Sequence, residues 1–553
     1  MAKNTVLEKN KCYPMTVRAV NNLGNGVGEI DGMVVFVRGG VTGDALTVRI
    51  IKTNRSFCVG RIEAIIKPSP HRAADACPAP LSCGGCAYRA LDYAHELELK
   101  RTDIVHAFRR AGLPDVVVEP VRSTGQTAGY RNKAQYPFAP SPEGVEVGFY
   151  AARSHRLVPA GGCILQPPIF GEIALAVRDF AREKGIPAYD ETTGQGLLRH
   201  LYLREGRVTG EILVCVVVNG DTLPCASELV ERLTGRFSGI VGVLLNHNTA
   251  DTNLILGERY TTLWGRDYLE DILCGLRFSI RPAAFYQVNH DGAELLYGIA
   301  REKAALRGDE TLLDLYCGIG TIGLSMADGV RELVGIEIVD DAVKCAIENA
   351  KRNGVPNARF FCGDASTTEG LLAPVFAERP DFHPDVVILD PPRKGSTPEL
   401  LGYLARLGVE RIVYVSCDPS TLARDAAYLA AQGYAVGDVT PVDMFPRTGH
   451  VETVVLLSKG EVDSKKIRVE FSLEDMDMSE FQDGATYPQI KAYVLEHSGL
   501  KVSNLYISQI KRKCGIEVGK NYNLPKSEDS RQPQCPPEKE KAIREAFKYF
   551  GMI

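Results

Sequence analysis

The sequence predicts an α/β fold, a Rossmann-like doubly wound sheet in the C-terminal half of the chain, and two observations support it. First, apolar β-branched segments at 385–389 and 411–415 flank a stretch with helical spacing of leucines at 400–407, which indicates strand, helix, strand. Two strands joined in this way run parallel and are buried. Second, each strand is followed by a polar run, Asp-Pro-Pro-Arg at 390–393 and Ser-Cys-Asp-Pro at 416–419. Both runs therefore reach the sheet edge where ligands of such folds bind.

Length and composition predict several domains of a soluble protein. A chain of 553 residues is too long for one core and indicates three or four domains. It shows no apolar run of membrane-spanning length, no signal peptide and no lipidation motif, so a cytoplasmic location is expected. Fifteen cysteines favour a reducing compartment. The net charge of −5 excludes a globally basic protein, so a nucleic-acid partner needs a local basic patch.

Residues 1–68 are expected to form a small β-barrel. Apolar segments at 17–20, 33–37, 45–50 and 58–62 are separated by turns rich in Gly, Asn and Asp, as in short strands. This spacing suits a five-stranded barrel of the OB kind, which often binds oligonucleotides. A generic barrel used for docking is the alternative.

A cysteine cluster follows the barrel. Three cysteines, Cys77, Cys83 and Cys86, lie within ten residues, and the last two flank a Gly-Gly pair. Zinc and an iron–sulfur cluster both need four such ligands, and the spacing does not choose between them. The fourth ligand must come from elsewhere. Cys163 has small neighbours, and Cys12 and Cys58 are the alternatives.

Residues 69–280 are expected to form a mixed α+β domain with a face for RNA. A helix is predicted at 92–112, with apolar residues on one face and bases, Lys100 among them, mostly on another. Bases alternate with aromatic residues in three clusters, at 130–133, 153–156 and 199–204. Such clusters suit phosphate neutralisation and base stacking, although solvated surface charge is the usual explanation of any one of them.

The cofactor half of the predicted site lies at 312–321, where a strand runs into a Gly-rich turn. Glu337 ends the next strand, the place where an acidic residue holds ribose hydroxyls, so NAD and S-adenosylmethionine both fit. The missing third glycine and the Asp-Pro-Pro run, which resembles a methyltransferase motif, favour S-adenosylmethionine. Asp364 could contact the adenine, Gln287 is an amide placed just before this unit, and Cys317 is interpreted as a packing residue.

At this point the sequence resembles the RNA (uracil-5-)-methyltransferases of the RumA/TrmA family. The matching residues are Gln287, 316–318, Glu337, 390–393, 416–419 and 450–452, and the resemblance covers about 11–459. The barrel resembles a TRAM domain, and with the cysteines it points to the RumA-like 23S rRNA branch (RlmD type). The resemblance implies a [4Fe–4S] cluster on Cys77, Cys83, Cys86 and Cys163. It also implies that Gln287, Tyr316, Glu337 and Asp390 bind S-adenosylmethionine, with Thr321 standing in that loop where Asn is expected.

The chemistry of this family explains the residue types. C5 of uracil is a weak nucleophile until a thiolate adds to C6, and Cys417 is the expected thiolate. Glu452 is the candidate base that removes the C5 proton. The alternative for Glu452 is a surface carboxylate beside the strand at 453–457, and without the resemblance the two interpretations weigh equally. Arg393 and Lys394 could neutralise a phosphate near a flipped-out base.

The predicted function is S-adenosylmethionine-dependent methylation of C5 of a uridine in 23S rRNA by a monomeric enzyme. The runner-up is the same chemistry on a tRNA T-loop, and a non-catalytic iron–sulfur RNA-binding protein is the alternative from another class. The methyltransferase domain is expected at 281–460. Residues 461–553 form an extension beyond the family's length, with helices at 489–497 and 504–514. That extension is either a helix-turn-helix-like nucleic-acid contact or a stabilising appendage.

Overall fold

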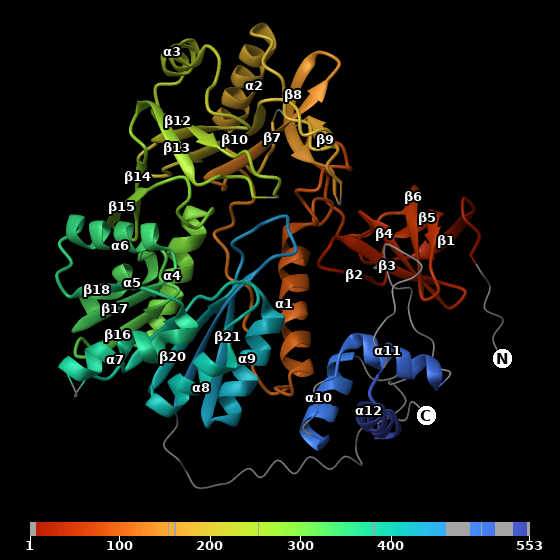
Figure 1. Ribbon diagram of the computed structural model, residues 1–553. Helices are drawn as coiled ribbons and strands as arrows, with labels where there is room; N and C mark the ends of the chain where they lie inside the picture. Colours follow the sequence, from red (N-terminus) through yellow and green to blue (C-terminus); the bar gives the residue numbers. More distant parts are fainter. Residues whose placement is uncertain are drawn as a thin grey trace. The chain divides into compact units, whose positions relative to one another are not determined.

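The structure is a computed structural model that describes residues 7–152, 154–159, 162–252, 254–379, 382–459, 487–498, 500, 502–514 and 535–549. It divides into two compact units, Met1–Asp463 and Ser464–Ile553, each described here by itself (Figure 1). Arg153 of the second basic cluster and residues 160–161 beside Cys163 lie outside the described residues. Within those residues, no helix combines the length and apolar character needed to cross a bilayer. The four predicted domain ranges stay predictions.

The N-terminal part of the first unit is a strand-rich, curled sheet, as expected, but with six strands. They are β1 (Cys12–Thr16), β2 (Ala19–Val20), β3 (Asn25–Ile30), β4 (Met33–Arg38), β5 (Ala45–Thr53) and β6 (Phe57–Lys67), in the order β1-β5-β6-β4-β3-β2. Alternate residues of β4 and β5, such as Val35 and Val48, fill its core. Strand β3 follows the same alternation, but two of its buried positions are Gly26 and Gly28, where a Cβ would collide with neighbouring backbone and side chains.

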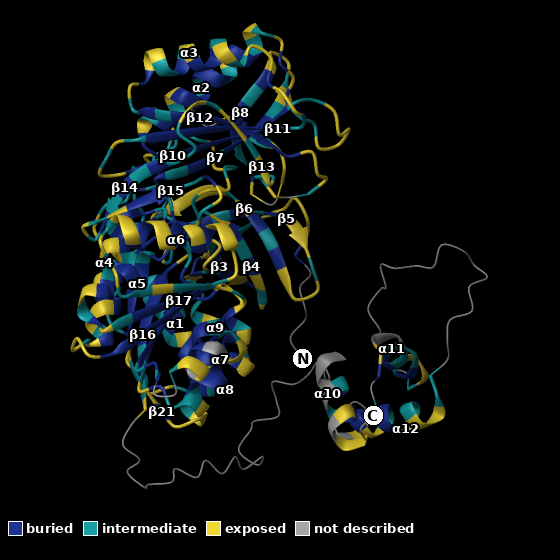
Figure 2. Cartoon of the chain, turned by 60° about the vertical axis from the view of Figure 1, so that its left-hand side comes forward, coloured by how far each residue is buried: buried dark blue, intermediate teal, exposed yellow. Residues whose placement is uncertain are grey.

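A second sheet and its helices make up the central part. The elements are α1 (Tyr93–Arg110), β7 (Lys133–Ser141), β8 (Gly144–Tyr150), β9 (Leu157–Pro159), α2 (Pro168–Glu183), β10 (Leu198–Glu205), β11 (Ile212–Val218), α3 (Ala226–Arg236), β12 (Ile240–His247) and β13 (Arg259–Gly265), followed by the hairpin β14 (Leu269–Leu273) and β15 (Leu276–Ile280). The sheet order is β13-β12-β11-β10-β7-β8-β9. Strands β10 to β12 are almost wholly buried (Figure 2).

One part of the predicted RNA face is wrong. Arg199, His200 and Arg204 lie on β10, in the middle of the sheet, and all three are buried. The Arg199 guanidinium donates to the carbonyls of Asn248 and Ala250, both at 2.8 Å, and Arg204 donates to that of Ala284 at 3.0 Å. These arginines satisfy backbone oxygens inside the fold, so they are not available to phosphates.

The third sheet is the predicted doubly wound α/β sheet. Its strands are β16 (Thr311–Leu315), β17 (Glu332–Glu337), β18 (Ala358–Cys362), β19 (Val386–Leu389), β20 (Arg411–Ser416), β21 (Tyr434–Val442) and β22 (Glu452–Lys459). Their order is β18-β17-β16-β19-β20-β22-β21. The first five run parallel, and β22 is antiparallel to both β20 and β21. The strand order reverses between β16 and β19, the place where such sheets bind ligands.

Two cores, one on each face, hold this sheet. Helices α4 (His290–Ala304), α5 (Thr321–Met326) and α6 (Asp340–Arg352) pack on one face. Helices α7 (Thr368–Glu378), α8 (Pro398–Leu407) and α9 (Pro419–Ala431) pack on the other, joined by α1 from the central part. Successive strand residues alternate between the cores, as Leu312 and Leu313 do, which follows from the two-residue period of a strand.

The second unit is a small helical cluster of α10 (Tyr487–Ser498), α11 (Asn504–Lys513) and α12 (Pro537–Tyr549). Its own core contains Ile490, Val494, Ile507, Ile543 and Phe547. The two predicted helices are confirmed, and α12 was not predicted.

Candidate active site

The predicted site residues gather where β16, β19 and β20 end and β22 begins. The chain leaves β16 at Tyr316, whose φ of +66° is in the left-handed region, and Gly318 and Gly320 follow with φ of +56° and +84°. This tight turn ties back to β17, because the amide of Gly318 donates to Glu337 Oε2 at 3.0 Å. Glu337 Oε1 accepts from the amide of Val339 at 2.9 Å. The Gly318 bond thus ties the Gly-rich turn to the end of β17.

Asp314, a residue that no sequence motif indicated, is buried on β16 beside this turn. Its Oδ2 accepts from the amide of Gly323 at 2.9 Å, while its Oδ1 has no hydrogen-bond partner among the described residues. Burial raises the pKa of Asp314 to about 7, and the charges of Asp390 and Glu337 add to this effect. Its one visible signal in the sequence is a carboxylate inside an otherwise apolar strand. A ligand with a positive charge would relieve this crowding of carboxylates.

Cys417 lies between the end of β20 and the start of α9. Asp418 caps that helix by accepting from the amide of Ser420 at 2.9 Å, and Ser416 Oγ accepts from the amide of Asp418 at 3.1 Å. These bonds fix the short link on which Cys417 stands. Cys417 is partly exposed.

Glu452 is the first residue of β22 and lies next to Cys417 through strand pairing. Thr453 pairs with Ser416 across the sheet, and its Oγ1 donates to the Ser416 carbonyl at 2.9 Å. Glu452 is only 4% exposed. Burial raises its pKa to about 8, Asp390 raises it further, and Arg393 opposes the shift.

Burial also perturbs Cys417 and Asp390. Burial raises the pKa of the Cys417 thiol to about 11, with contributions from Glu452 and Asp390, and Arg393 lowers it. Burial alone raises the pKa of Asp390 to about 7. A thiol, two carboxyls and one guanidinium thus act on one another at this edge of the sheet, and perturbed groups of this kind are typical of catalytic sites.

Arg393 is on a loop that α9 holds in place. Thr421 Oγ1 donates to the Arg393 carbonyl at 3.2 Å, and the Arg424 guanidinium donates to the carbonyl of Lys394 at 3.0 Å. The amide of Ser396 donates to Asp425 Oδ2 at 2.8 Å. The amide of Asp390, where this loop begins, donates to the carbonyl of Leu315 at the end of β16 at 3.5 Å. The loop after β19 and the turn after β16 are therefore connected.

The other predicted cofactor residues surround this site on separate elements. Gln287 is buried just before α4, and its carbonyl accepts from Asn132 Nδ2 at 2.9 Å. Thr321 Oγ1 and the Tyr297 hydroxyl are 3.0 Å apart. Asp364 caps the 3-10 turn after β18 by accepting from the amide of Ser366 at 2.8 Å. Their predicted contacts with a cofactor stay predictions.

The four predicted cysteine ligands lie near one another. Burial raises the pKa of Cys86 to about 12, and the nearby thiols of Cys163, Cys77 and Cys83 raise it too. Arg89 donates to the Cys77 carbonyl at 3.0 Å and so braces this segment. Nowhere in the described ranges do three His, Cys, Asp or Glu side chains converge on the position of a single metal ion. Cys58, one of the alternatives, is buried in the N-terminal sheet, and Cys12 is exposed on β1.

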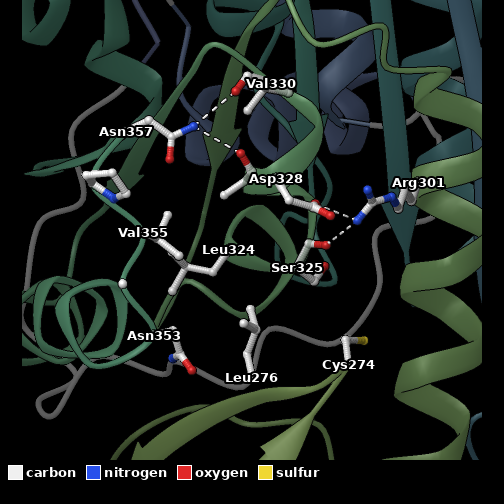
Figure 3. Close-up of a pocket in the computed structure, with 13 residues that line it drawn as sticks. Cys274, Leu276, Arg301, Leu324, Ser325, Asp328, Val330, Asn353, Val355 and Asn357 are labelled. Atoms are coloured by element: carbon white, nitrogen blue, oxygen red, sulfur yellow. Dashed lines mark hydrogen bonds and ion pairs between the residues drawn. The ribbon is translucent and has the colours of Figure 1, made fainter.

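A cavity of about 520 Å³ lies at the opposite edge of the sheet. Asn357 and Val330 line it from the segments just before β18 and β17, and Arg301 reaches it from α4, paired with Asp328 (Figure 3). No predicted site residue is among its lining. It is separate from the site described above.

Comparison with known proteins decides the family. Residues 263–460 match the family model described as tRNA (Uracil-5-)-methyltransferase. An uncharacterized RNA methyltransferase of Clostridium acetobutylicum is 38% identical over 462 residues, which are 83% of this chain and 99% of the relative. The chain belongs to the RNA (uracil-5-)-methyltransferase family. The predicted family is thereby confirmed at this level, and the matched span contains the predicted cofactor residues together with Cys417 and Glu452.

A further relative and a solved structure support the same family assignment for this RNA methyltransferase. An uncharacterized RNA methyltransferase of Gloeobacter violaceus is 39% identical over 449 residues, 81% of this chain and 96% of the relative. The Pyrococcus abyssi tRNA (uracil-54, C5)-methyltransferase, solved in complex with S-adenosyl-L-homocysteine, is similar in structure with a TM-score of 0.64 and 25% identity. The similarity covers 80% of this chain and all of that one.

Proposed function

We propose that this RNA methyltransferase transfers a methyl group from S-adenosylmethionine to C5 of a uridine, with Cys417 as nucleophile and Glu452 as base. The observation that carries the proposal is the joint position of the Cys417 thiol, the buried carboxyl of Glu452 and the half-buried Asp390. A thiol and a carboxyl with a raised pKa are the two groups that this chemistry needs. The family and the structural neighbour holding S-adenosyl-L-homocysteine support the cofactor.

The residues around the Gly-rich turn fit this cofactor. S-adenosylmethionine supplies a methyl group activated by a positively charged sulfur, and it also carries an ammonium group. Asp314 Oδ1 is a buried oxygen that has no hydrogen-bond partner in the part of the chain that the structure describes, and Asp390 and Glu337 act on the same carboxyl. Cationic groups placed there would pair with carboxylates that otherwise crowd one another. Glu337, at the end of β17, would hold the ribose hydroxyls.

The chain's own residues account for the two proton-linked steps. The Cys417 thiol first loses its proton to water, and the thiolate Sγ then bonds to C6 of the uracil. The C5–C6 π electrons move into the ring as an enolate, which makes C5 a carbon nucleophile. After C5 has gained the methyl group, Glu452 takes the C5 proton, the C5–C6 double bond re-forms and the bond from C6 to Cys417 breaks. Arg393 lowers the pKa of both groups, so it favours the thiolate and the carboxylate. A base of high pKa is a stronger proton acceptor once it is ionised.

The proposed RNA is 23S rRNA. The curled N-terminal sheet, which we interpret as a TRAM domain, and the four neighbouring cysteines support this choice, because both features belong to the rRNA-modifying branch that the sequence resembles. A uridine of tRNA is the second candidate. It is favoured by the structural neighbour, which is a tRNA (uracil-54, C5)-methyltransferase.

We also propose that Cys77, Cys83, Cys86 and Cys163 hold a [4Fe–4S] cluster. The chemistry of the donor set supports it, because four thiols come together from two distant segments, and the neighbouring thiols contribute to the raised pKa of Cys86 and of Cys163. A cluster spreads its ligands more widely than a single ion does, which is compatible with the absence of a single-ion site among the described residues. The methylation chemistry requires no redox step, so the cluster's proposed role is structural.

The test uses purified protein, labelled S-adenosylmethionine and unmodified transcripts of 23S rRNA and of tRNA. We expect label in 5-methyluridine of the 23S transcript; label in tRNA alone would overturn the choice of RNA. RNA containing 5-fluorouracil should trap a covalent adduct on the wild type, because fluorine cannot leave as a proton. Cys417→Ala should abolish both results, while Cys225→Ala, at an exposed thiol before α3, should change neither. Retained turnover in Cys417→Ala would end this mechanism.

A further inference from the structure

The loop that leads to Glu452 begins and ends at one pair of residues in the sheet. Val442, the last residue of β21, pairs with Glu452, the first residue of β22. Residues 443–451 therefore leave the sheet and return to it at the proposed catalytic base. Strand pairing therefore holds the chain at Glu452 and after it, and the conformation of the loop 443–451 decides how the chain enters Glu452.

A buried lysine from α1 holds the start of this loop. Lys100 Nζ donates to Asp443 Oδ1 at 2.7 Å, to the Phe445 carbonyl at 3.2 Å and to Glu96 Oε1 at 2.8 Å. Glu96 lies one helical turn before Lys100 and itself accepts from the amide of Arg447 at 2.7 Å. One ammonium group thus joins segments that are 343 residues apart in the sequence.

Neighbouring groups complete this attachment. The Tyr93 hydroxyl donates to Asp443 Oδ2 at 2.8 Å, and the Tyr130 hydroxyl donates to the Pro446 carbonyl at 3.0 Å. Arg447 has a left-handed φ of +69°, and its carbonyl accepts from the amide of Tyr88 at 3.0 Å. The loop is therefore clamped over most of its first half by groups from the central part of the unit.

The charges of this cluster balance, although they are buried. Lys100, Glu96 and Asp443 are each at most 1% exposed, and the Arg447 guanidinium lies 3.6 Å from Glu96. Burial raises the pKa of Glu96, and Lys100 opposes this shift. Apolar side chains of similar size could fill the same space at little or no cost in stability. A buried ionic cluster with this geometry is therefore better explained by the conformation that it specifies than by the stability that it adds.

We propose that Lys100 is a positioning residue that holds the loop 443–451 and thereby places the Glu452 carboxyl for removal of the C5 proton. This inference rests on the proposed function, because it needs Glu452 to be the base. It assigns a role in the reaction to a residue of α1 that the sequence placed among bases lying mostly on a different face from the apolar one.

The test separates the base step from the steps before it. Lys100→Met removes the ammonium group and keeps the length of the side chain. Turnover on ordinary uridine RNA should fall about 10–100-fold, because a displaced base loses much of its effect. The covalent enzyme–RNA adduct should then accumulate on ordinary RNA. Formation of the adduct with 5-fluorouracil RNA, which needs no proton removal, should stay within about threefold of the wild type.

Three further variants sharpen the result. Lys100→Arg keeps the positive charge and should restore most of the turnover. Arg110→Met, at an exposed base of the same helix, should leave both measurements unchanged. The double variant Lys100→Met, Asp443→Asn removes one charge of each sign and should show the same defect in the base step. It takes the place of Lys100→Met in the test if that single variant folds poorly.

Two results would overturn the inference. One is a wild-type turnover in Lys100→Met, and the other is an equal loss of turnover and of 5-fluorouracil adduct, which would indicate a general structural role. Absence of the adduct in the wild type itself would instead overturn the proposed function, and the inference with it.

Discussion

Replacing Glu452 by glutamine should make the protein more stable at neutral pH than the wild type. Burial raises the pKa of Glu452 from 4.5 to about 8. Between these two values the folded chain keeps a proton that the unfolded chain releases, so the free energy of unfolding falls as the pH rises through this window. Glutamine has a similar shape and does not titrate, so it removes this loss.

The size of the effect follows from the shift. One pKa unit corresponds to about 1.4 kcal/mol of free energy, so the advantage of the glutamine variant should grow by about 3 kcal/mol from about pH 5 to about pH 7.5. In a folded unit of this size that corresponds to a few degrees in the melting temperature. The glutamine variant gains stability because the reaction proposed for Glu452 needs its carboxyl in an environment that disfavours the charged form.

The assay is thermal unfolding of wild type and Glu452→Gln across this pH range, with Glu410→Gln as the matched control at an exposed glutamate. The difference between Glu452→Gln and wild type should widen with pH, and that between Glu410→Gln and wild type should not. A difference that is constant with pH would mean that the Glu452 carboxyl is already ionised in the folded protein. The account of a base with a raised pKa would then be wrong.

Two further predictions follow. Asp314→Asn should weaken binding of S-adenosylmethionine by about tenfold or more, because a charge-assisted hydrogen bond is lost. The control Asp328→Asn, at the opposite edge of the sheet, should bind it like the wild type. If equilibrium dialysis gives Asp314→Asn the same affinity as the wild type, Asp314 is not part of the cofactor site. If residues 464–553 are a stabilising appendage, deleting them should leave the salt dependence of RNA binding unchanged. If the deletion makes the slope of log affinity against log salt shallower, these residues contact phosphates of the RNA.

The catalytic sheet was predictable because its strands are parallel and buried. Such strands are continuous apolar runs, as at 386–389 and 411–415, and the polar residues after them share one edge by geometry alone. Cys417 and Asp390 could therefore be placed together from the sequence. The place of Glu452 required the register of an antiparallel strand, Thr453 against Ser416, which no local pattern encodes.

The buried charges could not be predicted. Lys100 and Arg204 have the residue types of a solvated or RNA-binding surface, and each is buried because its partners come from distant segments, Asp443 for one and the Ala284 carbonyl for the other. Asp314 was hidden for the opposite reason, because it interrupts an apolar strand by a single residue. In each case the deciding fact is a tertiary contact, and helical or strand periodicity contains no information about it.

Helix α1 has a consequence for how the enzyme can be divided. Its residues Ile104 and Phe108 belong to the same apolar core as α8 and α9, and residues 118 and 122 form bridges along β21. A fragment that starts at residue 281 would lack α1 and would expose this apolar face of the catalytic sheet to water. The smallest catalytic fragment that folds alone must therefore begin near the start of α1. The domain boundary predicted at 280/281 falls between two parts of the chain that share one hydrophobic core.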